Sequence, residues 1–382
     1  NTNNTKKPQP AEQTTVQPTT MSAEEINDRK LDKFISDMTL EEKVGQMFFV
    51  RCPDEGAVQQ VSEYNIGGSI LFGIDFDGKT KDEVLDDIHS YQNEADIPLL
   101  IGVDEEGGTV VRVSSNPNLR ETPFLSPKDT YADGGWDAVK QDAEEKADLL
   151  LSLGINVNLA PVCDMTSDEY GFMYDRSFSS DVDMENRYVR TVVETSKSKK
   201  LGTVLKHFPG YGNNSDTHTG IAYDDRDYSE FENTDFKPFY QGIESGADCI
   251  LVSHNIVNCM DSEYPASLSQ KVHDILRNEF KFDGVIMTDD LIMDAITDFT
   301  GDEAAAVTAA KCGNDLLCCS SVNTQYPAVL EAVQNGEIPE AQVDASVKRI
   351  LKWKQNLGIF SIDTYQKKVK STEPTDTVGS EE

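Results

Sequence analysis

Carboxylates and an imidazole stand in this chain where short apolar runs end. Asp104 closes the run PLLIGVD, Lys206 and His207 lie near the end of TVLKHF, and Asp289 falls at the end of GVIMTDD. An ionised carboxylate can attack an electrophilic carbon, and an imidazole can donate or accept a proton near neutral pH. Gathered in one place, groups of these types would suit nucleophilic or acid–base catalysis.

A polar loop at 213–219, flanked by glycine, adds Asp216 and His218 in the order Asp-x-His. Such an Asp can orient the imidazole and stabilise its cationic form, so that the imidazole acts as general acid and base. Taken alone, an Asp-x-His in a loop is more often a turn with a surface histidine. Asp289 alone could equally be the N-cap of a following helix. The residue types permit the chemistry but do not identify it.

Eight short apolar runs carry or precede these residues and predict eight strands. They are 44–52, 68–72, 98–104, 155–164, 203–208, 249–255, 284–290 and 315–320. Each run is mostly apolar at both parities, as expected of parallel strands covered on both faces. With helical patterns between them, they predict an α/β fold of the TIM (β/α)8-barrel type, whose functional groups gather where the strands end. A doubly wound open sheet is the alternative, although no GxGxxG or P-loop motif supports it.

Three helices have specific signals in the sequence. Thr39 and Glu42 have the spacing of a capping box, a helix over 137–153 is predicted to end at Gly154, and an amphipathic helix over 343–357 should close the fold. We therefore expect one catalytic barrel domain over 23–361. Residues 1–22, rich in Thr, Asn, Gln and Pro, predict a disordered tether, and 362–382 predict a flexible C-terminal tail.

The tether suggests where the protein works. The chain begins at Asn1 rather than Met, which suggests that an upstream segment, which could have carried a lipid anchor, was removed. We expect an extracellular or cell-surface-tethered protein, and a monomer. A tethered solute-binding lipoprotein would have the same terminal pattern.

Composition excludes several classes of protein. The 68 acidic and 34 basic residues give a net charge of −34, which argues against nucleic acid as a partner, because Lys and Arg must neutralise phosphates there. No apolar run reaches the roughly 18 residues of a membrane span. The seven cysteines lack CxxC spacing and lie mostly in apolar runs, which predicts buried thiols and no disulfide framework or metal site. We expect no cofactor.

Several motifs resemble those of glycoside hydrolase family 3, in the branch of bacterial β-N-acetylglucosaminidases. They are IGGSILFG (66–73), GVDEEGGTVVRV (102–113), LAPVCDM (159–165), DRSFSSD (175–181), KHFPGYGNNSDTH (206–218), LVSH (251–254) and GVIMTDDLIMDAI (284–296). They occur in the family's order and cover roughly residues 30 to 360. KHFPG followed by DxH, and then TDDLxM, are the specific signals.

The resemblance implies a retaining exo-β-N-acetylglucosaminidase that removes terminal GlcNAc from peptidoglycan fragments or chito-oligosaccharides. Asp289 would be the nucleophile that forms a covalent glycosyl-enzyme, and His218 with Asp216 would be the acid/base dyad. Asp290 should point away from the site, because side chains alternate along a strand. The residues implied to bind the sugar are Asp104, Arg176, Lys206 and His207.

Other functions remain open at this stage. A β-glucosidase or β-xylosidase would keep the fold and change the sugar, and an imidazole acid/base could admit phosphate and give a GlcNAc phosphorylase. A non-catalytic cell-wall-binding lipoprotein and a Schiff-base aldolase using Lys206 are alternatives of other kinds. Tyr211 stands where this branch commonly has a second His, and Thr109 replaces a common Arg, so the leaving-group preference is in doubt.

Overall fold

The structure, a computed structural model, describes residues 21–214, 220–293, 296 and 299–367. Eight parallel strands form one sheet in the order β10-β1-β2-β3-β4-β5-β7-β9. Because β10 pairs with β1, and an isolated bridge joins Met287 of β9 to Leu316 beside β10, the two ends of the sheet meet as a nearly closed barrel. The strands are β1 Phe48–Arg51, β2 Gly68–Leu71, β3 Leu100–Val103, β4 Val157–Asn158, β5 Gly202–Phe208, β7 Cys249–Val252, β9 Val285–Thr288 and β10 Leu317–Cys319.

All eight predicted strands are present, each within or beside its predicted run, and the barrel prediction is confirmed. The observed strands are shorter than the runs, because several runs continue into the loops beyond the strand. The open-sheet alternative is wrong, since its edge strands would not pair with each other. Two further strands of two residues each, β6 Tyr223–Asp224 and β8 Ile256–Val257, pair outside the barrel.

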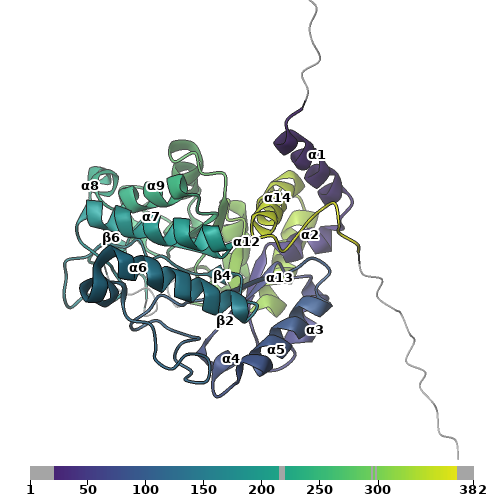
Figure 1. Cartoon of the computed structure of the whole chain (residues 1–382). Coiled ribbons are helices and arrows are strands. Elements are labelled where there is room, and N and C mark those ends of the chain that lie inside the picture. The colour runs from purple at the N-terminus through teal and green to yellow at the C-terminus, as the bar shows by residue number, and fades with distance from the viewer. Residues whose placement is uncertain (1–20, 215–219, 294–295, 297–298, 368–382) are drawn as a thin grey trace, which may run out of the picture.

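Helices surround the barrel, and Figure 1 shows α6 and α7 lying side by side along one flank, with α1 and α14 adjacent elsewhere on the molecule. The α-helices are α1 Ala23–Ser36, α2 Leu40–Gln46, α3 Ala57–Tyr64, α4 Gly73–Phe76, α5 Lys81–Glu94, α6 Pro127–Ser152, α7 Val182–Lys199, α8 Tyr228–Asn233, α9 Phe236–Ser245, α10 Gln270–Asp274, α12 Asp302–Lys311, α13 Val322–Gln334 and α14 Glu340–Asn356.

Local sequence explains where several helices begin and end. The Thr39 hydroxyl accepts the Glu42 N–H at 3.2 Å and the Glu42 carboxylate accepts the Thr39 N–H at 2.9 Å, which confirms the predicted capping box. The helix predicted over 137–153 is the second part of α6, which begins earlier and kinks at Gly134 and Gly135. The predicted closing helix is α14, whose Val343, Val347, Ile350 and Leu351 are buried.

The barrel interior is filled by one apolar cluster with side chains from all eight strands, including Phe49, Leu100, Val204 and Met287. Phe49 occupies the space that two glycines leave open. A Cβ added at Gly68 or Gly102 would lie 2.6 Å from the Phe49 ring, so the ring needs glycine on the neighbouring strands. This packed interior supports the strand ends that carry the site.

The two ends of the described chain pack on each other. Tyr365 lies edge-on to Phe34 of α1, with 4.9 Å between ring centroids, and Lys30 pairs with Asp363 at 2.5 Å. Residues 362–367, which the sequence assigned to the tail, therefore contact the body. Residues 1–20 and 368–382 lie outside the described residues. No helix in the described part of the chain combines the length and apolar character needed to cross a membrane.

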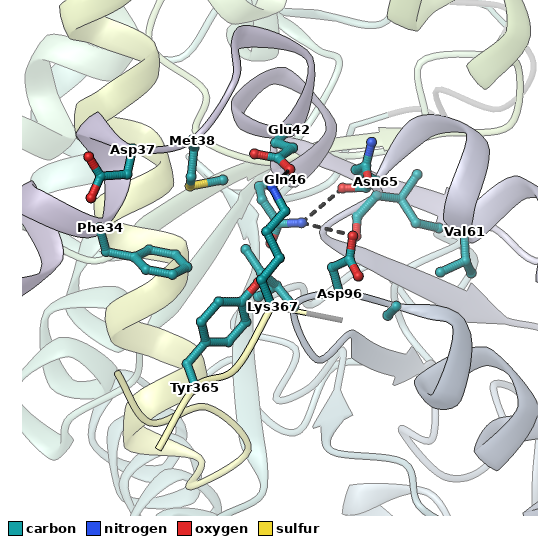
Figure 2. A pocket seen from close by; sticks show the side chains of 13 residues that line it. Phe34, Asp37, Met38, Glu42, Gln46, Val61, Asn65, Asp96, Tyr365 and Lys367 are labelled. Carbon is teal, nitrogen blue, oxygen red and sulfur yellow. Dashed lines mark hydrogen bonds and ion pairs between the residues drawn. The ribbon is translucent and has the colours of Figure 1, made fainter. Parts of the chain in front are cut away.

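A cavity of about 210 Å3 lies between these terminal segments and the starts of β1, β2 and β3. Figure 2 shows Phe34 and Tyr365 at its wall and Gln46 in its floor, donating to the carbonyls of Asn65 and Ile66. In a barrel of this type the N-terminal ends of the strands serve stability, whereas the opposite face carries function. This cavity is therefore not the active site.

Lys354 of α14 is buried behind the same region, and its Nζ donates to Gln46 Oε1 at 2.7 Å. Burial lowers the pKa of this lysine to about 7. Its pKa in the unfolded chain is near 10.5, so the unfolded chain binds more protons between pH 7 and 10.5. Stability should therefore rise with pH across this window, and below pH 7 the buried ammonium keeps its full penalty.

Replacing this lysine by methionine removes the buried charge while keeping most of the volume. We expect Lys354→Met to raise the free energy of unfolding at pH 7 by roughly 1–3 kcal/mol. It should also reduce the increase in the free energy of unfolding between pH 7 and 10, as measured by urea unfolding at several pH values. Lys352→Met, which removes a surface ion pair with Asp28, is the matched control. An equal pH slope in wild type and Lys354→Met would contradict this assignment.

Candidate active site

The C-terminal ends of the strands bring the predicted site residues to one face of the barrel. Asp104 directly follows β3, Lys206 and His207 lie near the C-terminal end of β5, and Asp289 directly follows β9. Lys206 Nζ donates to Asp104 Oδ1 at 2.6 Å. Because β3 and β9 run parallel in the same barrel, Asp104 and Asp289 follow strand ends that open on the same mouth.

Glu106 joins two of the predicted sugar-binding residues, and the sequence analysis did not select it. Its Oε1 lies 2.6 Å from Lys206 Nζ and 2.8 Å from Arg176 Nη2, while Arg176 Nε donates to Oε2 at 2.9 Å. The Arg176 contact is the bidentate arrangement that a guanidinium makes with a carboxylate. Together with Asp104, these side chains form an alternating network of two carboxylates and two cations, which we call the ion network.

The charges of the ion network hold one another in the ionised state. Burial alone would raise the pKa of Glu106, but Lys206 and Arg176 outweigh it and hold that pKa far below its usual range. Burial likewise lowers the pKa of Lys206, but Asp104 and Glu106 reverse the effect, so the net shift is upward. The site therefore presents fixed charges to a ligand at any ordinary pH. Such preorganised groups suit the recognition of hydroxyl groups.

His207 is held by protein groups at both ring nitrogens. Nδ1 lies 2.7 Å from Asp164 Oδ2, and Nε2 lies 3.3 Å from Arg176 Nη2. A guanidinium can only donate, so Nε2 must accept there and the proton sits on Nδ1, facing Asp164. Asp164 also accepts the backbone N–H groups of His207 at 3.0 Å and Tyr211 at 2.7 Å. This carboxylate therefore fixes both the ring and the start of the loop beyond β5.

Lys206 and His207 reach the same site although they are consecutive, and neighbouring side chains of a regular strand point to opposite faces. The pairing of β5 with β7 shifts register between Leu205 and Phe208, and the Lys206–His207 peptide bond is cis. The strand is therefore irregular at the point where both side chains are needed.

Glu105 performs a different task from the carboxylates on either side of it. Its buried carboxylate accepts the N–H groups of Arg112 at 2.8 Å, Val113 at 2.7 Å and Ser114 at 3.3 Å. It thus folds the loop after β3 back on itself. Gly107 and Gly108, two and three residues further along the chain, have φ of 103° and 64°, which favour glycine.

Asp289 is half-buried at the mouth, and its Oδ1 accepts the backbone N–H of Asp290 at 2.9 Å. Asp290 accepts from the Ser320 hydroxyl at 2.5 Å and from the Ile292 N–H at 3.2 Å, as a structural residue would. Burial raises the pKa of Asp290. His254 Nε2 lies 3.0 Å from the Asp290 carbonyl oxygen, so this nitrogen carries a proton and steadies the backbone beside Asp289.

Asp216 and His218 lie outside the described residues. The chain leading to them is anchored, because the Thr166 hydroxyl donates to Asn213 Oδ1 at 2.7 Å. The dyad assignment therefore remains a prediction.

The structure adds two residues, Glu106 and Asp164, to the candidate site that sequence reasoning selected. Asp164 ends a predicted strand, which is the signal that identified Asp104, and could have been found in the same way. Glu106 had no comparable signal, because three acidic residues stand in a row at 104–106 and the sequence does not show which of them turns inward.

Comparison with known proteins identifies the group to which this site belongs. Residues 39–353 match the family described as "Glycosyl hydrolase family 3 N terminal domain". The "Beta-hexosaminidase" of Hydrogenovibrio crunogenus is 32% identical over 286 residues, which are 73% of this chain and 79% of the relative. "Beta-hexosaminidase LpqI" of Mycobacterium tuberculosis is 31% identical over 327 residues, 81% of each chain.

Solved structures agree with these relatives. A glycoside hydrolase family 3 β-N-acetylglucosaminidase from Paenibacillus sp. str. FPU-7 superposes with a TM-score of 0.79 and 28% identity, over 90% of this chain and 66% of that chain. The M. tuberculosis LpqI structure superposes with a TM-score of 0.76 and 26% identity, over 85% and 96% of the two chains. The family match covers the barrel and every described residue of the site. The chain therefore belongs to glycoside hydrolase family 3, and it is a glycoside hydrolase.

Proposed function

We propose that this protein is a retaining exo-β-N-acetylglucosaminidase with Asp289 as its nucleophile. The observation that carries the proposal is the position of Asp289, at the end of β9 on the same barrel mouth as the ion network, in a chain whose relatives are named β-hexosaminidases. A carboxylate placed there can reach an anomeric carbon while the fixed charges beside it hold the rest of the sugar.

The reaction has two steps. Asp289 attacks the anomeric carbon and forms a glycosyl ester as the glycosidic bond breaks, and the protonated His218 gives its proton to the departing oxygen. Water then attacks the same carbon while His218 removes its proton, which frees GlcNAc and restores the Asp289 carboxylate. Asp216 orients the imidazole and stabilises its cationic form.

The ion network would hold the terminal sugar. Asp104 has acceptor capacity for sugar hydroxyls beyond its contact with Lys206, and its side chain is partly exposed. Arg176 and Lys206 supply N–H donors, and His207 is held by Asp164 beside them. The natural substrate would be a peptidoglycan fragment or a chito-oligosaccharide with GlcNAc at its non-reducing end. An extracellular or cell-surface location is part of this proposal, and a relative from Arthroderma benhamiae that is named a secreted glycosyl hydrolase supports it.

Mass spectrometry after exposure to a slow fluorinated GlcNAc substrate tests the nucleophile directly. We expect one covalent glycosyl adduct on the peptide that contains Asp289, and NMR of the first product should show the β-anomer. The Asp289→Asn variant is the control and should form no adduct. An adduct on another residue, or an α-anomer as first product, would contradict the proposal.

A further inference from the structure

A second cavity, of about 500 Å3, opens beside the active site, and we call it the outer cavity. Its wall is formed by the segment after β4, the segment after β5, β6, and residues of α8 and before α9. Tyr211 connects it to the sugar site, because this residue lines the cavity and its ring lies edge-on to His207 with 5.3 Å between centroids. Its lining includes Thr166, Ser167, Asn213, Tyr223, Glu230 and Asp235.

The lining is acidic, and the guanidinium of Arg226 in this lining forms its hydrogen bonds with other groups of the protein. Arg226 Nε and Nη2 donate to Asp224, Nη1 donates to both oxygens of Asp235, and Nη2 also donates to the Gly210 carbonyl. These contacts engage all three of its nitrogen atoms. Arg226 therefore holds the wall in place and offers little to a ligand's carboxylate.

Two further carboxylates of the lining, Asp225 and Glu230, are exposed. Asp225 accepts from the Asn258 amide at 2.5 Å, and within the described chain neither carboxylate has an ion pair with Lys or Arg. Among the described residues, the lining thus has four acidic side chains against one basic side chain. A concave surface of one sign concentrates its field, so an anionic ligand is repelled and a neutral or cationic ligand is not.

One exposed tyrosine stands in the wall of the outer cavity. Tyr223 lines the cavity and is 57% exposed. The C–H face of a pyranose ring can pack on a flat aromatic ring, and the hydroxyl of a tyrosine adds a polar group at its edge.

We infer that the outer cavity is the subsite for the leaving-group side of the substrate, and that it selects uncharged or cationic amino sugars over sugars with a carboxylate. This rests on the proposed function. The preferred substrate would then be a chito-oligosaccharide, with GlcNAc or glucosamine next to the bond that breaks. A muramic acid unit would bring its carboxylate against Asp225 and Glu230.

The kcat/KM ratio of chitobiose to the GlcNAc–MurNAc disaccharide tests this inference. In the wild type we expect a ratio above one, and raising the salt from 20 to about 300 mM should lower it, because screening relieves the repulsion of the carboxylate. Glu230→Lys should lower the ratio by roughly three- to tenfold, given the energy of one reversed charge within about 10 Å. Glu232→Lys, on the same helix but outside the lining, is the matched control and should leave it unchanged.

Tyr223→Ala separates the aromatic contact from charge. It should reduce kcat/KM for chitotriose relative to an aryl GlcNAc by about fivefold or more, since one stacking contact is lost. A ratio of chitobiose to GlcNAc–MurNAc that is equal in Glu230→Lys, Glu232→Lys and wild type overturns the inference. Failure of the wild type to cleave an aryl GlcNAc would instead overturn the proposed function, so the two failures are distinguishable.

Discussion

Asp289→Asn is expected to lower kcat for aryl GlcNAc hydrolysis by at least about 10³-fold, because the glycosyl-enzyme cannot form without the carboxylate. The fold should be intact. Asparagine keeps an oxygen that accepts the Asp290 N–H, and the side chain is only half-buried. Steady-state kinetics and thermal unfolding measure the two effects separately.

Azide provides a sharper test of the same residue. In Asp289→Ala the small anion can enter the vacated space, attack the anomeric carbon and give an α-glycosyl azide from a substrate with a good leaving group. Asp290→Asn is the neighbouring control, and we expect its activity to stay within about tenfold of the wild type. Its side chain accepts hydrogen bonds from Ser320 and Ile292 and does not point into the barrel mouth. Equal losses in Asp289→Asn and Asp290→Asn, with no azide product, would remove Asp289 from the mechanism.

Glu106→Gln should be the most damaging change within the ion network. It leaves Lys206 and Arg176 buried with one carboxylate, Asp104, in place of two. Removing one partner of a buried ion pair destabilises a protein by about 3–5 kcal/mol. Denaturant unfolding measures this loss, and Glu121→Gln, at an exposed carboxylate, should change stability by less than about 0.5 kcal/mol.

The stability of Glu106→Gln should also depend on pH differently from that of the wild type in acid. Burial raises the pKa of Glu106, but Lys206 and Arg176 lower it more strongly. The pKa of Glu106 in the folded protein therefore lies far below the unfolded value of 4.5. The stabilisation is therefore complete above pH 4.5 and is lost as the pH falls toward the folded pKa. Glu106→Gln should lose less stability than the wild type between pH 5 and 3. Parallel acid-unfolding curves would show that Glu106 is not held ionised by its neighbours.

The barrel could be predicted because its strands are apolar on both faces and because strand and helix patterns alternate along the chain. The positions of Asp104, Lys206, His207 and Asp289 followed from the rule that polar residues at strand ends meet at one mouth. The short strands β6 and β8 could not be predicted. Each has only two residues, too few to show the alternation of a strand, and their pairing depends on loops that meet only in the folded chain.

The division of labour among Asp104, Glu105 and Glu106 could not be predicted either. The three residues are adjacent and chemically alike, and a turn through Gly107 and Gly108 decides which carboxylate meets which partner. The ring nitrogen of His207 that carries the proton could not be predicted either, because it depends on Arg176 and Asp164, which are distant in sequence. The type of a residue defines the interactions that its side chain can make, whereas its neighbours in the folded chain determine which of these interactions form.

Both ends of the described chain leave the barrel on the face opposite the catalytic mouth. Phe34 and Tyr365 meet at the starts of β1 to β3, whereas Asp104 and Asp289 follow the other ends of their strands. A solid support or a fused carrier attached through either terminus would thus leave the catalytic opening turned toward the surrounding medium. Immobilised enzyme should hydrolyse bulky glycans as readily as free enzyme does.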